Sequence, residues 1–512
     1  MDVTAPAGCN WTATSNDSWI TIASGASGSG NGTVKYSVAA STARAPRSGT
    51  LTVAGQSLTV TQGAMYTANF PQFANGARWV SSVVLTNPSR TDTASGWLSF
   101  FDSQGQPVSI SVNGQTPASR IPFTIRPLGS STFTTNGSGD LVAGSAQASA
   151  GIPISGVIKY FHPSLGTAGV PEGAPRRAVM AFVSRDSGEG LDSGIALSNP
   201  QAAPVELALS LRGLDGREVS GGSGSLSLPA NGHVAKFVHE LFPGADTAKF
   251  QGSVIVTAAS TDGLVSVAAL RLGSYLGQFT TLPVVAVDPA PTATDLYFAQ
   301  FANGGGWSSS LYFANPLGEA STGTLSFLDD GGNPLIVPAD RWLTPASAGI
   351  TIPPRGSAVL STDGEGALVA GTAILRASSA VGGVLTFARP DLGMATVSGS
   401  VPMAAFIIPV ARSADLKTST GVAIASAGTA VKLALTLRNE SGEPVPGGNV
   451  TLDLPSNGHL ARYVEELFPQ VDLRAFRGTL TVAAQGGGIV GTALQLGEKQ
   501  GDLTALPVTE LR

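Results

Sequence analysis

The chain has 512 residues, of which 42% are hydrophobic and only 12% are charged, and its formal net charge is -5. A charged fraction about half the usual value, together with 64 glycines, favours short strands joined by many turns over a helical enzyme. The basic residues form no run longer than a pair such as Arg176-Arg177, which argues against nucleic acid and anionic membranes as partners.

The single cysteine, Cys9, excludes a disulfide framework within the chain. We expect its side chain to be a small buried hydrophobe rather than a nucleophile. The longest apolar runs, such as residues 282–287, are the size of a strand and fall short of the roughly 20 residues of a membrane span. Residues 1–15 lack the basic start and the apolar run of a signal peptide.

The first 63 residues predict strands separated by turns. Residues 9–13 and 18–22 are the first two candidates, and residues 33–38 alternate with a period of two. Residues 50–53 and 57–62 flank a tight Ala54-Gly55-Gln56 turn, which predicts a hairpin.

This segment resembles a BACON domain over almost all of residues 1–63, through the run GCNWTATSNDSWITIASGASGSGNGTVKYSVAAS and the hairpin that follows it. The resemblance implies an immunoglobulin-like β-sandwich of the kind found in bacterial surface proteins and secreted glycoside hydrolases, with a suggested carbohydrate-binding role. The family has one or two further strands before the position of Val3. We therefore expect the chain to be a fragment or its start to be misassigned, and the protein to be extracellular or on the cell surface.

The rest of the chain is duplicated at an offset of about 226 residues. FPQFANG at residues 70–76 returns as FAQFANG at 298–304, and LPANGH at 228–233 returns as LPSNGH at 454–459. FTTLPV at 279–284 returns as LTALPV at 503–508. The two halves have therefore diverged with few net insertions.

Each half is itself double. SVVLTNP at residues 82–88 matches GIALSNP at 194–200, and both precede a glycine turn, at Gly105 and Gly216. The fourth quarter keeps the turn at Gly442 but lacks the Asn-Pro pair. We predict an all-β chain of tandem immunoglobulin-like β-sandwiches. The expected domains are a truncated BACON-like sandwich at 1–64 and repeats at 65–175, 176–293, 294–404 and 405–512.

A short helix is predicted in each of the second and fourth repeats. Residues 231–242 and 457–468 both carry apolar residues at i, i+3, i+4, i+7 and i+8, which is one face of a helix of about three turns. Asn231 and Asn457 are the expected N-caps. We favour a helix that plugs the core over one that docks a partner.

Few residues suggest chemistry. The four histidines (His162, His233, His239 and His459) are scattered, and only His233 and His459 correspond between the halves. No Gly-x-Ser-x-Gly elbow or phosphate-binding loop occurs, and acidic pairs such as Asp329-Asp330 read as turns. We expect no catalytic residue, no metal site and no cofactor.

Sugar binding needs aromatic rings that can stack on a pyranose. The candidates are Trp11, Trp79 and Trp307, with core packing as the competing interpretation. The sequence favours a non-catalytic extracellular protein with a structural, adhesive or spacer role, and with glycans or other surface proteins as partners. The alternatives are a carbohydrate-binding protein acting through the BACON-like module, and the accessory region of a secreted hydrolase.

Overall fold

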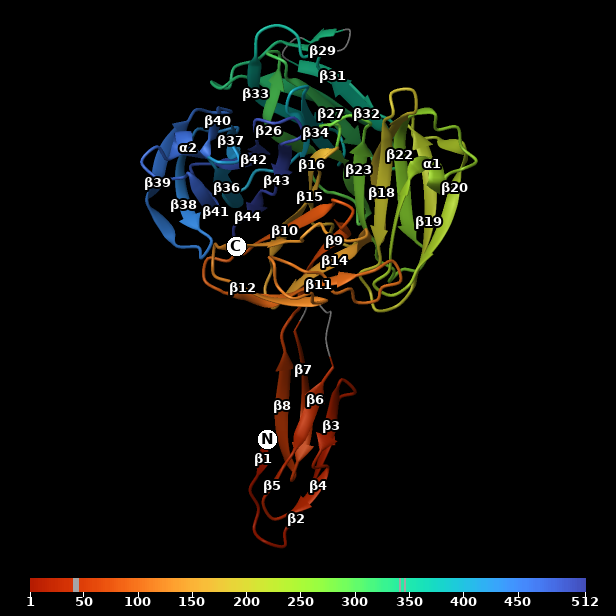
Figure 1. The fold of residues 1–512 in the computed structure, drawn as a ribbon, viewed down its shortest axis with the longest axis vertical. Coiled ribbons are helices and arrows are strands. Elements are labelled where there is room, and N and C mark those ends of the chain that lie inside the picture. The colour runs from red at the N-terminus through yellow and green to blue at the C-terminus, as the bar shows by residue number, and fades with distance from the viewer. Residues whose placement is uncertain (40–45, 340–341, 345–346) are drawn as a thin grey trace.

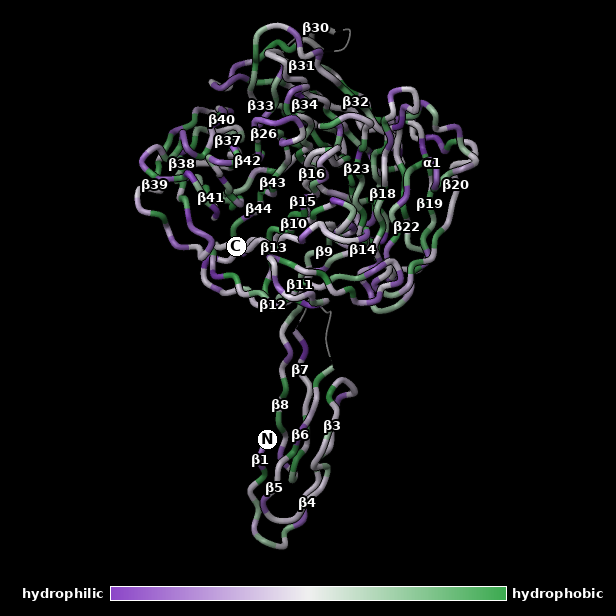
Figure 2. Tube along the Cα trace, in the orientation of Figure 1, coloured by the Kyte–Doolittle hydropathy of each residue, from purple (hydrophilic) through white to green (hydrophobic). Residues whose placement is uncertain are grey.

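The structure, a computed structural model, describes residues 1–39, 46–339, 342–344 and 347–512. An elongated N-terminal arm projects from four β-sandwiches that are arranged as a ring (Figure 1). Hydrophobic stretches follow the strands, and hydrophilic ones gather at the outer turns (Figure 2). The prediction of an all-β chain of tandem sandwiches is confirmed.

The arm is built from short antiparallel strands around a small core that includes Val3, Ile20, Val34 and Leu51. Its strands are β1 (Asp2–Val3), β2 (Asn10–Ser15), β3 (Ile20–Ser24), β4 (Ser27–Ser29), β5 (Gly32–Thr33), β6 (Lys35–Val38), β7 (Arg47–Val53) and β8 (Gln56–Gln62). The predicted hairpin is β7–β8.

Sandwiches 1 and 2 each pair two antiparallel sheets, with orders β13-β10-β15-β16 and β12-β11-β14-β9 in the first, and β20-β19-β22-β17-β25 and β21-β18-β23-β24 in the second. Sandwich 1 contains β9 (Tyr66–Asn75), β10 (Val80–Thr86), β11 (Ala94–Phe101), β12 (Arg120–Ile125), β13 (Ser130–Thr134), β14 (Val142–Ala150), β15 (Ser155–His162) and β16 (Gly166–Pro171). Sandwich 2 contains β17 (Ala178–Asp186), β18 (Asp192–Ser198), β19 (Val205–Gly213), β20 (Glu218–Leu228), β21 (His233–Phe237), α1 (Val238–Leu241), β22 (Lys249–Ala258), β23 (Ser266–Leu272), β24 (Thr280–Leu282) and β25 (Val284–Asp288).

Sandwiches 3 and 4 repeat these sheet orders, as β26-β33-β28-β31 with β32-β27-β34-β35, and β39-β38-β41-β36-β44 with β40-β37-β42-β43. Sandwich 3 contains β26 (Asp295–Asn303), β27 (Ser308–Ala314), β28 (Ser321–Leu328), β29 (Val337–Ala339), β30 (Trp342–Thr344), β31 (Ser347–Ile352), β32 (Ser357–Ser361), β33 (Val369–Ala377), β34 (Gly382–Arg389) and β35 (Gly393–Ser398). Sandwich 4 contains β36 (Ala405–Ser413), β37 (Ser419–Ala427), β38 (Val431–Asn439), β39 (Pro444–Leu454), β40 (His459–Tyr463), α2 (Val464–Leu467), β41 (Ala475–Gln485), β42 (Gly488–Leu496), β43 (Leu503–Leu506) and β44 (Thr509–Glu510).

The helices exist where they were predicted, but their extent and N-caps were wrong. Residues 233–237 form β21, which pairs with β18, and only Val238–Leu241 is helical. Asn231 is not an N-cap, because it lies in a turn with a φ of 57°. A helix of three turns is marginal alone, so the ladder to β18 outweighs it. The same correction applies to Asn457 and α2.

One buried hydroxyl recurs in every sandwich and relates all four. The Ser81 Oγ donates to the carbonyl of Ala74 at 2.8 Å and accepts the N–H of the same residue at 3.0 Å. Three further hydroxyls make the same pair of bonds to the first strand of their own sandwich: Ser193 to Ser184, Ser309 to Ala302, and Thr420 to Ala411. This pattern links the fourth quarter to the others more clearly than its sequence does.

The asparagine of each Asn-Pro pair is a structural residue. Asn199 is fully buried, and its Nδ2 donates to the carbonyls of Ala203 at 2.7 Å and Pro229 at 2.9 Å. Its Oδ1 accepts the N–H of Gln201 at 3.0 Å. Asn87 and Asn315 make corresponding bonds. In sandwich 4 the position belongs to Ser426, whose hydroxyl donates to the carbonyl of Pro455.

The sandwiches join head to tail through one contact that occurs four times. The glycine of a turn in each sandwich presses against a backbone carbonyl of the next: Gly105 on Ala230, Gly216 on Pro354, Gly332 on Ser456, and Gly442 on Pro127. A hydrogen bond accompanies each contact: His233 N to Ser103 O, Ser357 N to Leu214 O, His459 N to Asp330 O, and Ser130 N to Glu440 O. Because the fourth contact returns to sandwich 1, the ring closes.

The inner edge strands β16, β24, β35 and β43 meet at the centre of the ring, where β16 and β35 each contact both β24 and β43. Four hairpin-tip glycines converge there: Gly166, Gly277, Gly393 and Gly501. A Cβ atom on Gly166 would lie 2.6 Å from the Cα of Gly501, so there is no room for a side chain where these hairpin tips meet.

We predict that Gly442→Ala weakens the joint that closes the ring. Gly442 has a φ of 80°, and a Cβ atom there would lie 2.0 Å from the carbonyl oxygen of Pro127. Gly366→Ala is the matched control, because Gly366 has a φ of 81° and no atom within 4 Å of the position of its Cβ. Calorimetry should show that Gly442→Ala costs roughly 1–3 kcal/mol more than Gly366→Ala. Equal melting temperatures for the two variants would contradict this joint.

We also predict that Asn199→Ala destabilises sandwich 2 by roughly 2–4 kcal/mol, because buried carbonyls lose their donor. The control is Asn136→Ala, since Asn136 is exposed and its Oδ1 accepts the N–H of Ser138, two residues along the chain. Urea denaturation measures both changes. A loss at Asn199 no larger than that at Asn136 would argue against a structural role.

Candidate functional site

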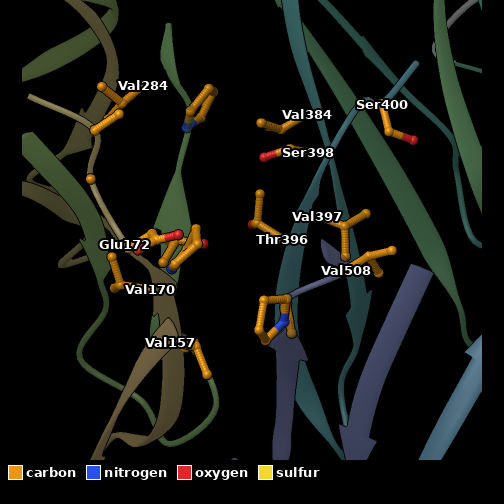
Figure 3. A pocket seen from close by; sticks show the side chains of 18 of the residues that line it. Val157, Val170, Glu172, Val284, Val384, Thr396, Val397, Ser398, Ser400 and Val508 are labelled. Atoms are coloured by element: carbon orange, nitrogen blue, oxygen red, sulfur yellow. The ribbon is translucent and has the colours of Figure 1, made fainter. Parts of the chain in front are cut away.

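A cavity of about 610 Å³ lies at the ring centre and is lined by all four sandwiches. Val157 and Val170 lie on one side of it, and Val384, Val397 and Val508 lie on the opposite side (Figure 3). No aromatic side chain is among the described residues that line it. The cavity therefore suits an aliphatic group better than a sugar ring.

Several hydroxyl groups of this cavity bond to other protein hydroxyls. The Thr396 Oγ1 bonds to the hydroxyls of Thr280 at 3.1 Å and Thr386 at 2.8 Å. The hydroxyls of Thr509 and Ser155 are 2.7 Å apart across the joint between sandwiches 4 and 1. The Thr280–Thr396 and Ser155–Thr509 bonds join neighbouring sandwiches at the wall of the cavity.

A second concave site, which we call the aromatic groove, lies between sandwiches 3 and 4 and has a volume of about 350 Å³. Trp307, Leu368 and Phe387 come from sandwich 3, and Tyr463 and Leu494 come from sandwich 4. Tyr463 is 40% exposed and Leu368 is 56% exposed, so the groove opens to solvent. Arg462 and Glu466 also line it and are exposed.

The three predicted tryptophans lie in three separate places. Trp11, on β2, is 6% exposed, and its Nε1 donates to the carbonyl of Gly30 at 2.8 Å. Gly28 and Gly32 lie against its ring, so that a Cβ atom on either would come within 2.4 Å of it. Its surroundings are those of a core side chain, and ligand binding by Trp11 stays a prediction with no open ring face to support it.

Trp79 and Trp307 precede β10 and β27 at equivalent positions, but their neighbours differ. The Trp79 ring lies 4.8 Å from the ring of His162 and 5.7 Å from that of Phe279. The Trp307 ring has the guanidinium of Arg389 5.5 Å from its centroid and lines the aromatic groove. Of the three candidates, Trp307 therefore lies in a site that a ligand can enter.

Comparison with known proteins bears on the arm alone. Residues 10–63 match the family model of BACON, which is described as "Putative binding domain, N-terminal". The N-terminal arm is a BACON domain. A search of curated proteins finds no match to the chain.

Within the BACON domain, the aromatic side chain most open to solvent is Tyr36 on β6, at 37% exposed. Trp19 is only partly exposed, and the guanidinium of Arg47 lies 4.3 Å from its ring centroid. Tyr36 is therefore an exposed aromatic ring that was not among the candidates predicted from the sequence, which were all tryptophans. In sandwich 1, Trp97 is a second overlooked ring: it is 40% exposed, with Arg120 over it at 4.3 Å.

The two corresponding histidines are joint residues. The His233 Nε2 lies 2.6 Å from the Gln72 Oε1 of sandwich 1, and the His459 Nε2 lies 2.7 Å from the Gln300 Oε1 of sandwich 3. Burial lowers the pKa of His233 to about 4. Burial also lowers the pKa of His459, although the nearby Asp330 carboxylate opposes this shift.

Two other side-chain predictions have opposite outcomes. Cys9 is exposed just before β2, so the expectation of a buried hydrophobe was wrong. Asp329 lies in a turn, as predicted, and its carboxylate accepts the N–H groups of Gly331 and Asn333. Those backbone bonds, that of Asn333 foremost, lower the pKa of Asp329.

The described part of the chain holds no cluster of three or more His, Cys, Asp or Glu side chains placed to bind a metal ion. Within the same ranges, no helix is long and apolar enough to cross a membrane.

We predict that acid weakens the joint between sandwiches 1 and 2. The pKa of His233 falls from 6.5 in the unfolded chain to about 4 in the folded one, so between these values the unfolded state binds the extra proton. The contribution of the neutral His233 side chain to the free energy of unfolding is therefore fully present above pH 6.5. It is lost as the pH falls towards 4, and the total loss is roughly 3 kcal/mol. His233→Gln removes this titration. Its melting temperature should depend less on pH between 7 and 4.5 than that of the wild type, and an unchanged pH dependence would contradict the assignment.

Proposed function

We propose that this protein is a non-catalytic binding protein of the bacterial cell exterior, in which the closed ring is a rigid head that presents the BACON domain. The observation that supports this best is the arrangement in Figure 1, where the BACON domain projects from the ring as an arm. An arm held away from a compact head can reach a ligand without obstruction from the other sandwiches.

The packing supports a BACON domain that is independent of the ring. The core of the BACON domain contains residues between Val3 and Val60 and shares none with the cores of the ring. We therefore propose the boundary between residues 64 and 65 as a true domain boundary. Each of the other proposed units, 65–175, 176–293, 294–404 and 405–512, contributes to the ring and needs its neighbours at both joints.

For the ligand we propose a glycan, bound through the exposed ring of Tyr36 on the BACON domain. A flat aromatic side chain can stack on the apolar face of a pyranose, and 37% of the surface of Tyr36 is open to solvent. Other surface proteins are the alternative partners. The same geometry suits the accessory region of a secreted hydrolase, where the arm would hold a substrate for a catalytic unit.

We predict that the whole chain binds insoluble polysaccharide and that Tyr36→Ala lowers its affinity about tenfold, or about 1.4 kcal/mol. A sedimentation assay against cellulose, chitin and xylan measures this. The ring alone, residues 65–512, should not bind but should keep its melting transition.

The control variants separate binding from folding. Trp11→Ala removes a core side chain and should unfold the arm, whereas Tyr36→Ala should leave the melting temperature unchanged. Equal binding by the whole chain and by residues 65–512 would place the glycan site outside the BACON domain. Release of reducing sugar by the purified chain would show that the protein is a hydrolase.

A further inference from the structure

Backbone closes one end of the central cavity, where the four hairpin tips meet. The N–H of Gly277 donates to the carbonyl of Leu165 at 3.0 Å, and the N–H of Gly501 donates to that of Leu392 at 2.7 Å. The N–H of Thr167 donates in turn to the carbonyl of Gly501 at 2.8 Å. These bonds link tips from all four sandwiches, and each inner strand leaves its tip before it reaches the cavity wall.

The walls beyond these tips are mainly aliphatic. Valines from all four sandwiches line the cavity: Val157 and Val170 from the first, Val267 from the second, Val384 from the third and Val508 from the fourth. The cavity volume of about 610 Å³ is in the range of small-molecule sites, which is roughly 300–1,000 Å³. The space therefore has both the size and the lining of a binding site for an apolar group.

Prolines remove backbone donors from the same walls. Pro283 and Pro507 occupy equivalent positions in the LPV repeat, and Pro171 ends β16. All three line the cavity. A proline has no N–H group, so the backbone offers no hydrogen-bond donor to a ligand at these positions.

Three charged side chains are found among the described residues that line the cavity: Glu172, Arg176 and Glu510. Glu172 and Arg176 lie in the segment that joins β16 to β17, and Glu510 is exposed at the end of β44. All three come after the inner strands, away from the hairpin tips. Two carboxylates and one guanidinium make this rim negative, so it favours a cation over an anion.

We propose that the central cavity binds the aliphatic chain of an amphiphile whose head group is a cationic amine. The chain lies between the valine walls and points towards the hairpin tips, and the amine stays at the rim near Glu172 and Glu510. Burial of the chain supplies the affinity, and the rim selects the head group. This site belongs to the ring and does not depend on what the BACON domain binds.

The test is isothermal titration calorimetry of the whole chain with n-alkylamines of increasing length, each below the concentration at which it forms micelles. One amine should bind per chain. Each added methylene should raise the affinity about fourfold until the chain reaches the closed end, after which the affinity should level off. Decanoate should bind about tenfold more weakly than decylamine, because its head group has the opposite charge.

Ser398→Phe tests the position of the chain. Ser398 is exposed at the end of β35 and projects from the cavity wall (Figure 3), so a phenyl ring there should fill the cavity and lower the affinity for decylamine at least about tenfold. The matched control is Ser227→Phe, because Ser227 is an exposed serine on β20, at the opposite edge of its sheet from β25 and the cavity. This variant should bind like the wild type.

Glu510→Gln tests the head group without filling the cavity, and it should reduce the preference for decylamine over decanoate. Absence of alkylamine binding, equal binding by Ser398→Phe in a folded chain, or an affinity that rises with chain length without limit would overturn the proposal. Equal affinity for decylamine and decanoate would overturn the assignment of the head group. None of these outcomes depends on the sedimentation assay, which probes the arm.

Discussion

The contact between a turn glycine and the carbonyl of the next sandwich determines the architecture of the ring. At each joint the two backbones lie so close that a side chain at the glycine position would not fit between them. A backbone hydrogen bond accompanies each of these contacts. Such head-to-tail contacts produce an open filament unless the rotation between neighbours brings the last unit back to the first. Here the fourth contact, from Gly442 to Pro127, returns to sandwich 1. Closure of the ring brings the inner edge strands of the four sandwiches together at its centre. The central cavity is a consequence of this closure.

The four joints share this backbone contact but alternate in the residue that donates the hydrogen bond. The donor is a serine, Ser130 or Ser357, at the two joints between the halves, and a histidine, His233 or His459, at the two joints within them. The imidazoles reach across to a glutamine of the preceding sandwich, which the serines are too short to do. The backbone contact thus repeats four times around the ring, whereas the side chains at the joints repeat only twice. This agrees with the sequence, in which the two halves resemble each other more closely than the quarters do. The joints within the halves are also those where burial lowers the pKa of an imidazole, because burial disfavours its charged form.

The sequence predicts the strands, the repeats and the turn glycines because each leaves a local or periodic pattern. Gly105, Gly216 and Gly442 were recognised as turns, and their φ values near 80° agree. Their second role, contact with the next sandwich, leaves no local pattern, so closure of the ring could not be predicted. The helices were overestimated because the apolar spacing of residues 231–242 fits both a helix and a strand that turns into one. Tyr463 was missed since it meets Trp307 only across a joint, and Phe387 was missed since it comes from a different strand of sandwich 3.

The same separation between backbone and side chains explains how the two halves of a repeated ring can differ. When the joints are fixed by glycines, carbonyls and buried amides, the contact at each joint is made by the backbone and not by the side chains that pack between the sandwiches. Phe279 and Leu503 are an example of such side chains, because they occupy equivalent positions in the two halves. One carries a phenyl ring and the other an isobutyl group, and both are almost fully buried. The side chains at the joints can therefore differ between the halves, although all four joints share the same backbone contact.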